Sequence, residues 1–343
     1  MQILAIDIGM GTQDILFYDD EKRIENCYKM VLPSPTLRLA KRVRAANGRD
    51  ILLTGRVMGG GHLTRAVKRH IQEGGRVYTT PDAALTLNDN LDYVREMGVE
   101  VIETLHLNDD HETIKAEILQ LGDLNLEELG HVSEVYGIEI PERVAVAVQD
   151  HGFAPQMSNR VKRFELFEEA LKKGGRLDDF AYTSPPPEFN RMQAAAETIR
   201  ESGRKPLVMD TGPAAIRGAL LDSRAEEPAV VINIGNGHTI AAVVNESRII
   251  SLFEHHTSKI DTAKMDDYTK RLADGNLDFE EIFNDGGHGC YIHESIGFDK
   301  IKTILLTGPN REIMKESTLP ITYAVPFGDA MLTGCFGLVE STV

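Results

Sequence analysis

Apolar residues along the chain alternate between short continuous runs and longer amphipathic stretches, a pattern typical of an α/β protein. The run at 3–8 (ILAIDI) and a β-rich run at 14–20 flank a short glycine turn, which predicts a hairpin. A third run near 23–31 would complete a meander. The next predicted elements are a helix at 36–46, a strand at 50–54 and a helix at 62–73.

Residues 80–140 interrupt this alternation, because they are mixed and acidic, and we interpret them as an insertion. A clean strand pattern returns at 143–149 (RVAVAVQ). The elements predicted after it are helices at 160–173, 188–202 and 213–221, with a short strand at 206–210. The polar segment 222–228 then marks a candidate domain boundary.

The strand–glycine turn–strand pattern of the N-terminus recurs at 229–245. The elements predicted after it are a strand at 248–254, helices within 261–284, a strand at 302–306 and a closing helix at 328–340. The repeat predicts two domains of similar topology. We expect the first to comprise 1–221 and 326–343, and the second 222–325.

The charge balance argues against a polyanionic partner. The 343 residues include 37 Lys and Arg and 53 Asp and Glu, a net charge of −16, so we expect neither nucleic-acid nor membrane binding. No apolar run approaches the length of about 18 residues that a membrane span needs, and no signal-peptide pattern opens the chain. The three cysteines are widely spaced, which favours a cytoplasmic protein.

Two glycine turns carry the strongest chemical signal, IDIGMGTQD at 6–14 and INIGNGHTI at 232–240. Glycines let backbone N–H groups approach a polyphosphate closely. The residues expected to bind the phosphates are Gly9, Gly11, Thr12 and Asp14 in the first turn and Asn233, Gly235, Asn236, Gly237, His238 and Thr239 in the second. Asp7, at the end of the first strand, is expected to hold a hydrated Mg²⁺.

With these two turns the sequence resembles the actin-like ATPase superfamily of actin, heat-shock chaperones and sugar kinases. Three further segments follow in the order of that superfamily: MDTGPAAIRGALL at 209–221 and PFGDAMLTGCFGL at 326–338 resemble its two connecting helices, and ILLTGPNRE at 304–312 its adenosine-binding turn. The resemblance implies two ribonuclease-H-like domains with a nucleotide cleft between them, and ATP with Mg²⁺ as cofactors. It also implies that Gly308 and Pro309 contact adenosine.

More closely, the chain resembles a family of uncharacterised archaeal and bacterial proteins, some of which carry a pyruvate formate-lyase activase label. Radical-generating activases need a cysteine cluster, and this sequence has none. The second phosphate turn also departs from the superfamily pattern, because Asn233 stands where Asp is usual. Asn can hydrogen-bond a metal-bound water but cannot act as a base.

A catalytic base is therefore sought elsewhere. Asp150 and His151 follow the strand at 143–149, and in kinases of the superfamily an Asp often follows the corresponding strand. Such a carboxylate could accept the proton of an acceptor hydroxyl. The alternative is that Asp150 only caps the loop before the next helix, with His151 packed beneath it.

A histidine-rich set completes the candidate residues. Its members are His255 and His256 after a strand, and Asp285, Gly287 and His288 in a glycine-rich loop. Adjacent strand residues point to opposite faces, so at most one of His255 and His256 faces a given site. The set is expected to contact substrate, and the sequence leaves open whether it binds a metal instead, since its spacing matches no zinc pattern.

The leading hypothesis is an ATP- and Mg²⁺-dependent phosphotransferase or ATPase acting on a small molecule. A second is a metal-dependent carbamoyl-type transferase of the same superfamily, in which Asp329 and one or more of His151, His255 and His288 would bind the metal. A third is a non-catalytic nucleotide-binding switch, which Asn233 favours. The expected partners are an adenine nucleotide, a small-molecule acceptor and possible further copies of this chain.

Overall fold

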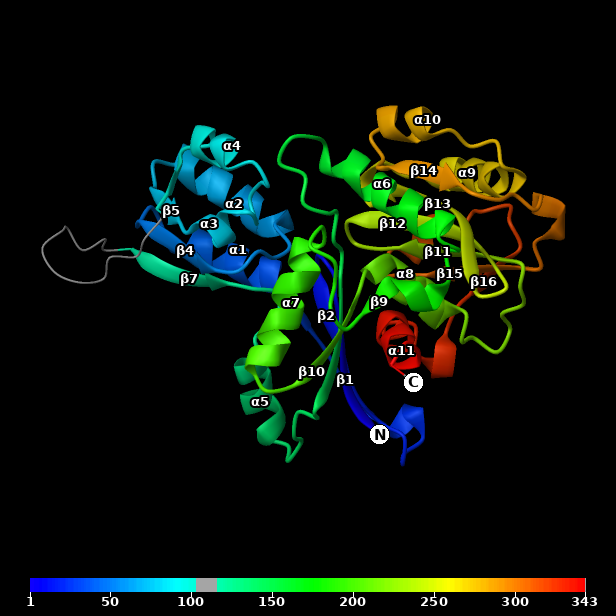
Figure 1. The fold of residues 1–343 in the computed structure, drawn as a ribbon, viewed down its shortest axis with the longest axis horizontal. Coiled ribbons are helices and arrows are strands. Elements are labelled where there is room, and N and C mark those ends of the chain that lie inside the picture. The colour runs from blue at the N-terminus through cyan, green and yellow to red at the C-terminus, as the bar shows by residue number, and fades with distance from the viewer. Residues whose placement is uncertain (103–115, 343) are drawn as a thin grey trace, which may run out of the picture.

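A computed structural model of the chain describes residues 1–102 and 116–342, which form three β-sheets and the helices around them (Figure 1). No helix in these residues is both long and apolar enough to cross a bilayer.

The first sheet has the strand order of a ribonuclease-H-like domain. Its strands, in spatial order, are β3 (Tyr28–Pro33), β2 (Thr12–Asp19), β1 (Gln2–Ile8), β8 (Arg143–Val148), β10 (Lys205–Met209) and β9 (Ala181–Tyr182). β1, β2 and β3 form an antiparallel meander, as predicted, while β8 pairs parallel with both β1 and β10. The parallel strands bring their carboxyl ends, and the residues after them, to one edge of the sheet.

The second sheet repeats the order of the first five strands and has its sixth strand, β14, at the opposite edge, beside the meander. Its strands are β14 (Gly289–Ile292), β13 (Arg248–His256), β12 (His238–Asn245), β11 (Ala229–Ile234), β15 (Thr303–Thr307) and β16 (Ile321–Tyr323). β11, β12 and β13 form the meander, and β15 pairs parallel with β11 and β16. Two such domains are the architecture of the actin-like ATPase superfamily, so the predicted fold class is confirmed by the strand order.

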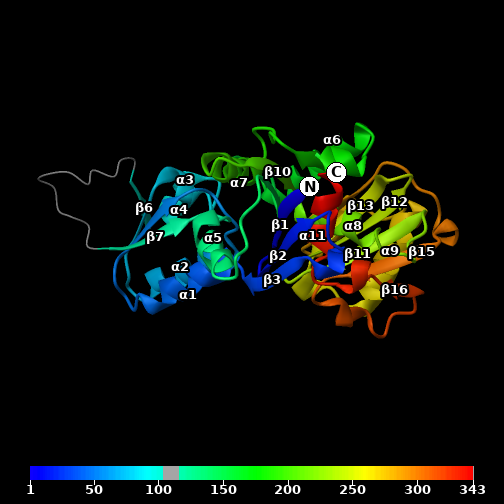
Figure 2. The ribbon, with the colours of Figure 1, turned by 90° about the horizontal axis from the view of Figure 1, so that it is seen from below.

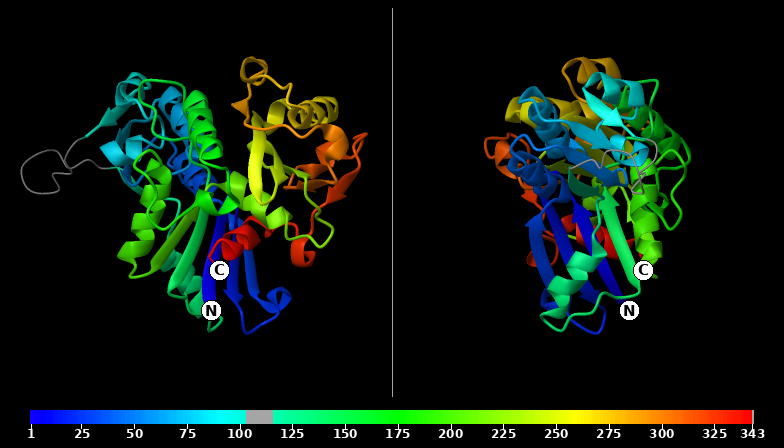
Figure 3. Two further views of the ribbon diagram at one scale, coloured as in Figure 1. Left: turned by 45° about the vertical axis from the view of Figure 1, so that its right-hand side comes forward. Right: turned by 90° about the vertical axis from the view of Figure 1, so that its left-hand side faces the viewer.

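Two helices cross between the sheets, α8 (Thr211–Ala219) and α11 (Thr333–Glu340). Their backbones touch: a Cβ on Gly218 would lie 1.8 Å from the Thr333 carbonyl oxygen, and one on Gly337 would lie 2.0 Å from that of Ala214. Figure 3 shows α11, in red, beside the blue β1. The closing helix begins at Thr333, later than predicted, because 326–328 forms a separate 3-10 turn.

The third sheet belongs to a unit inserted between β3 and β8. Its strands, all parallel, are β6 (Val99–Val101), β5 (Val77–Thr79), β4 (Ile51–Gly55) and β7 (Glu117–Leu121). Its helices are α1 (Pro35–Ala45), α2 (Gly61–Gln72), α3 (Pro81–Ala84) and α4 (Leu91–Glu96). Figures 1 and 2 place this unit at the far end of the molecule from the second sheet.

The predicted insertion, about 80–140, differs from this unit at both ends. β4 pairs directly with β7, so residues 51–55 belong to the inserted sheet. At the other end, α5 (Leu126–Glu134) packs through Leu126 and Leu129 into the core of the first sheet. The sequence carried no sign of the true start, because α1 and β4 continue the α/β alternation that precedes them.

The remaining helices cover the two main sheets. They are α6 (Asn159–Lys172), α7 (Asn190–Glu201), α9 (Thr262–Asp274) and α10 (Phe279–Asn284). α7 packs on β8 and β10, whereas α6 packs on β13 and β14 of the second sheet. The proposed division at residue 222 assigns α6 to the first domain by sequence, although Phe164 and Leu171 join a core that includes Leu252 of β13.

Arg163 of α6 ties the two sheets together in the interior. Its guanidinium donates through Nη1 and Nη2 to the carboxylate of Asp210, which follows β10, at 2.8 and 3.0 Å. Through Nε it donates to Glu254 of β13 at 2.7 Å. The three side chains are 3%, 5% and 1% exposed. Removal of one partner of a buried ion pair costs far more stability than the intact pair contributes relative to apolar residues of similar size.

We therefore predict that Arg163→Ala lowers the free energy of unfolding by about 3–5 kcal/mol, because two buried carboxylates lose their cation. Urea unfolding at pH 7.5 measures the change. The matched control is Arg69→Ala, which removes an exposed ion pair with Glu73 and should change stability by less than about 0.5 kcal/mol. A loss below about 1 kcal/mol in Arg163→Ala would contradict the role given to this residue.

Candidate active site between the two domains

The two predicted glycine turns have the same conformation and face each other. Gly9 N–H donates to the Thr12 carbonyl at 2.9 Å, and Gly235 N–H donates to the His238 carbonyl at the same distance. A Cβ added to Gly11 would lie 2.7 Å from Nδ2 of Asn236 in the opposite turn. A larger residue at position 11 would therefore require the Asn236 side chain to move.

Together the turns line a cavity of about 320 Å³ at the carboxyl ends of β1, β8, β11 and β15. The cavity is within the usual size range of small-molecule sites. The predicted site residues that line it are Asp7, Gly9, Thr12, Asp14, Asp150, His151, Asn233, Gly235, Asn236, Gly237, His238, Gly308 and Pro309. Residues far apart in the sequence thus converge as the strand order requires.

Asp7 and Asp14 form a pair of carboxylates on one wall of this cavity. They are directly opposite in the β1–β2 ladder, and each has a buried Oδ1 without a hydrogen-bond partner. Burial, and then the neighbouring Asp14, raises the pKa of Asp7 well above its ordinary value. Burial raises the pKa of Asp14 to about 7. Two desolvated carboxylates with free oxygens fit a hard divalent cation such as Mg²⁺.

Gly308 lets the end of β15 approach the second turn. Its φ of +99° is unfavourable for other residues. A Cβ there would also lie 2.3 Å from the Ile234 carbonyl oxygen and 2.6 Å from Oδ1 of Asn233. Two residues further on, Asn310 donates from Nδ2 to the Gly235 carbonyl at 2.9 Å and holds the turn in place. Contact of Gly308 and Pro309 with adenosine stays a prediction.

Asp150 is buried at the cavity wall and already accepts two hydrogen bonds. Its Oδ1 accepts from Gly152 N–H at 2.8 Å and its Oδ2 from Met192 N–H at 2.9 Å. Burial raises its pKa to about 6 in spite of these bonds. The capping interpretation thus describes its contacts, while a carboxylate titrating near neutrality is also suited to proton transfer. Its role as a base stays a prediction.

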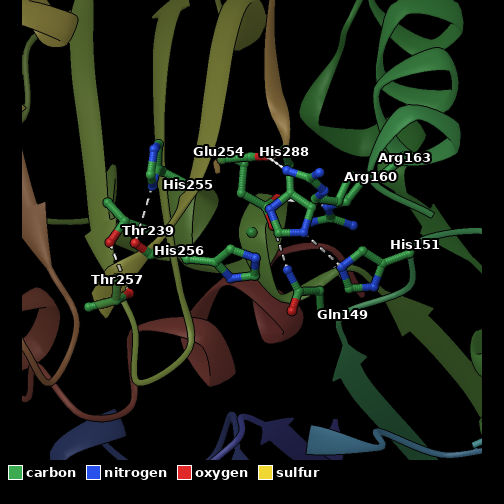
Figure 4. Close-up of polar contacts among 12 residues, drawn as sticks. Gln149, His151, Arg160, Arg163, Thr239, Glu254, His255, His256, Thr257 and His288 are labelled. Carbon is green, nitrogen blue, oxygen red and sulfur yellow. Dashed lines mark hydrogen bonds and ion pairs between the residues drawn. The ribbon is translucent and has the colours of Figure 1, made fainter. Parts of the chain in front are cut away.

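Three histidines and a glutamate gather beside the second turn, and Figure 4 labels His151, Glu254 and His288 among them. Donor atoms of His151, His238, Glu254 and His288 lie within 4.8 Å of one another. The closest contact joins Nε2 of His151 to Nε2 of His288 at 3.3 Å. Burial lowers the pKa of all three imidazoles, that of His238 to about 3. The rings are therefore neutral at pH 7 and keep a lone pair for a ligand.

His255 and Asp285 do not join this group, and their contact with substrate stays a prediction. His255 points to the other face of β13 (Figure 4), where its Nε2 lies 3.1 Å from Oδ2 of Asp285. Lys264 Nζ donates to the same oxygen at 2.7 Å. The separation follows from strand alternation, which turns Glu254 and His256 toward the cavity side and His255 away from it. The ring of His256 lies 4.9 Å from that of His288.

The other predicted residues that do not line the cavity are Gly11, Thr239, His256, Gly287, His288 and Asp329. Thr239 is fully buried and its hydroxyl pairs with that of Thr257 at 3.0 Å, because it points to the opposite face of β12 from His238. Asp329 lies beside Lys29, with Oδ2 3.5 Å from Nζ. Gly287 offers only its carbonyl, which accepts from Arg160 Nη1 at 2.6 Å.

Sequence reasoning missed the residues that hold the histidine group. Gln149 lines the cavity and donates from Nε2 to Oε1 of Glu254 at 2.6 Å. Arg163 holds the other oxygen of Glu254. The position of Gln149 at the end of a predicted strand was a usable signal. Arg163 gave no such signal in the sequence, because an arginine within an amphipathic helix ordinarily faces solvent.

The three cysteines do not form a donor set for an iron–sulfur cluster. Cys27, Cys290 and Cys335 are each buried and free. Cys27 and Cys335 belong to one hydrophobic core and Cys290 to another. An activase of the radical type needs three or more clustered thiolates, so these residues do not fit that cofactor.

Residues 58–313 match the family described as "Putative pyruvate format-lyase activating enzyme (DUF1786)", and the chain belongs to this family. No curated protein sequence matches the chain.

Several solved structures are similar over nearly the whole chain. The ethanolamine utilization protein EutJ from Carboxydothermus hydrogenoformans is 11% identical over 98% of this chain and 89% of its own, with a TM-score of 0.38. A chain of the PilM-PilN type IV pilus biogenesis complex is 11% identical over 100% and 99%, with a TM-score of 0.37. The ROK hexokinase from Thermus thermophilus is 12% identical over 99% and 97%, with a TM-score of 0.31. These identities and TM-scores are low, so the fold is assigned from the strand order of the two sheets.

The raised pKa of Asp14 predicts an unusual dependence of stability on pH. The folded state binds the carboxyl proton of Asp14 more tightly than the unfolded state does. The stability gained from this proton is complete below about pH 4 and is lost as the pH rises through about 7. A shift of this size corresponds to about 4 kcal/mol. Asp14→Asn cannot ionise, so between pH 4.5 and 7.5, in EDTA, it should gain stability relative to the wild type. Urea unfolding at both pH values measures this.

The control for this experiment is Asp299→Asn, which alters an exposed carboxylate far from the cavity. Its stability should follow that of the wild type at both pH values. If the stability of Asp14→Asn and that of the wild type depend equally on pH, the pKa of Asp14 is not raised in the folded protein.

Proposed function

We propose that this member of the family is an ATP- and Mg²⁺-dependent phosphotransferase or ATPase acting on a small molecule. The observation that carries the proposal is the pairing of two glycine turns across one cavity with two desolvated carboxylates, Asp7 and Asp14, beside them. Backbone N–H groups in such turns bind phosphate oxygens. A hydrated Mg²⁺ bound by one or two carboxylates bridges to those oxygens.

The two domains would divide the nucleotide between them. The first turn and Asp7 would hold the cation and part of the phosphate tail, and the second turn would hold the rest. Adenosine would lie along Gly308 and Pro309. Asn233 would orient a metal-bound water without supplying charge, which favours transfer to an acceptor over rapid hydrolysis.

The alternatives differ in what the cavity must contain. For the carbamoyl-type transferase, Asp329 and one or more of His151, His255 and His288 would bind a metal. Asp329 and His255 lie away from the histidine group, whereas His151 and His288 belong to it. The non-catalytic switch needs no base, and Asn233 favours it. It predicts tight nucleotide binding without turnover, so the experiments below separate it from the leading proposal.

Calorimetric titration with ATP, ADP and a non-hydrolysable ATP analogue, with and without Mg²⁺, tests nucleotide binding. We expect Mg²⁺ to strengthen binding of ATP. Asp7→Asn should weaken Mg²⁺-dependent binding at least about tenfold, because the cation loses a charged ligand. The control variant Asp299→Asn should bind as the wild type does. If no adenine nucleotide binds, the proposal fails.

Asp150→Asn tests the assigned base. If Asp150 accepts a proton during transfer, turnover should fall about 10²- to 10⁴-fold with nucleotide binding retained. Wild-type turnover should rise with pH through about 6, the pKa of this carboxyl. Urea unfolding of the variant checks the capping role separately, since the new amide also meets two backbone N–H donors. Unchanged turnover would remove Asp150 from the mechanism.

A further inference from the structure

We propose that His151, His238, Glu254 and His288 form a binding site for a divalent transition metal of the zinc or ferrous-iron class. This site goes beyond the proposed function, because it needs no nucleotide and is separate from the Asp7–Asp14 pair. All four donors lie within 4.8 Å of one another, as the ligands of a single ion must.

The donor spacing agrees with metal coordination. Four ligand atoms at about 2.1 Å from a tetrahedral metal lie about 3.4 Å from each other. His288 can ligate through only one ring nitrogen, and Nδ1, which has no hydrogen-bond partner, lies 3.5 Å from Oε1 of Glu254. The ring centroids of His238 and His288 are 4.7 Å apart, with the rings inclined at 70°.

Burial makes the group difficult to explain as an ordinary packed cluster. Glu254 and His288 are only 1% and 2% exposed, and Nδ1 of His288 has no hydrogen-bond partner. A buried polar atom without a partner is costly. One ion would give the three imidazoles and the carboxylate a common partner and remove that cost.

A second layer of contacts fixes the carboxylate, as is usual for metal ligands. Gln149 donates to Oε1 of Glu254 at 2.6 Å, and Arg163 donates to Oε2 at 2.7 Å. The loop that carries His288 is held in turn by Arg160, which donates to the Gly287 carbonyl at 2.6 Å. The donor set is therefore positioned by residues of both domains before any ion arrives.

The chemistry of the donors selects the class of metal. Three neutral imidazoles and one carboxylate suit zinc, iron or a similar first-row ion, whereas Mg²⁺ prefers oxygen ligands. The cavity thus offers two different sites, with oxygen donors at Asp7 and Asp14 and nitrogen donors at the histidines. Since His238 closes the second phosphate turn, the ion would lie at the end of the phosphate tail. There it could hold a water or an acceptor oxygen as a fifth ligand.

Metal analysis of the untagged, full-length protein tests the proposal. The protein is purified without chelator and analysed by mass spectrometry for zinc, iron, manganese, nickel, copper and cobalt. We expect one equivalent of zinc or iron per chain. Metal-free protein is then titrated with Co²⁺ in the absence of nucleotide, and visible absorption bands of Co²⁺ bound to nitrogen ligands should grow to one equivalent.

Two variants each remove one donor, and a third variant is the matched control. His238→Ala and Glu254→Gln should each weaken Co²⁺ binding at least about tenfold. His238 is only partly buried, so its variant is suited to retain the fold, which thermal unfolding checks. His293→Ala removes a partly exposed histidine outside the group and should keep full metal content.

Absence of metal from the purified protein together with no Co²⁺ spectrum would overturn the proposal. Stoichiometric metal retained by both donor variants would overturn it as well. Because the titration contains no nucleotide, failure of ATP binding leaves this result intact. Conversely, failure of metal binding leaves the nucleotide titration to be judged separately.

Discussion

The buried contact of Arg163 with Asp210 and Glu254 is the interaction on which the rest of the cavity depends. Arg163 also donates from Nη1 to the Asp150 carbonyl at 2.7 Å, so it fixes the loop that carries His151. Asp210 in turn accepts from Gly212 N–H at 2.9 Å and caps α8. One cation therefore sets the position of a helix, of the loop that carries Asp150 and His151, and of a carboxylate that faces the histidines.

Most of the fold could be predicted because its signals are local. Short continuous apolar runs such as 229–234 identify buried strands, and the recurrence of a glycine turn after two of them identifies the domain repeat. The phosphate turns could be predicted for the same reason, since glycine spacing is visible within nine residues. The two turns then line one cavity because the strand order brings β1 and β11 to equivalent places.

What could not be predicted depends on contacts between distant residues. The pleat of β12 decides whether Thr239 or His238 faces the cavity. The sequence shows that adjacent side chains point to opposite faces, but it does not show which face lies toward the cavity. The sequence analysis also predicted His255 and Asp285 as site residues. These two side chains contact each other, but on the face of the sheet that points away from the histidine group. The inserted sheet and the crossing of α6 to β13 were hidden because both continue ordinary α/β periodicity.

The glycine contact between α8 and α11 has a consequence for movement. Because Gly218 and Gly337 leave no side chain between the two backbones, the helices can pivot about this point but have little room to separate. It is therefore the natural hinge for any rotation of one domain against the other. Arg163 bonds Asp210 beside the first sheet and Glu254 in the second, so a rotation that separated these two carboxylates would have to break one of its ion pairs.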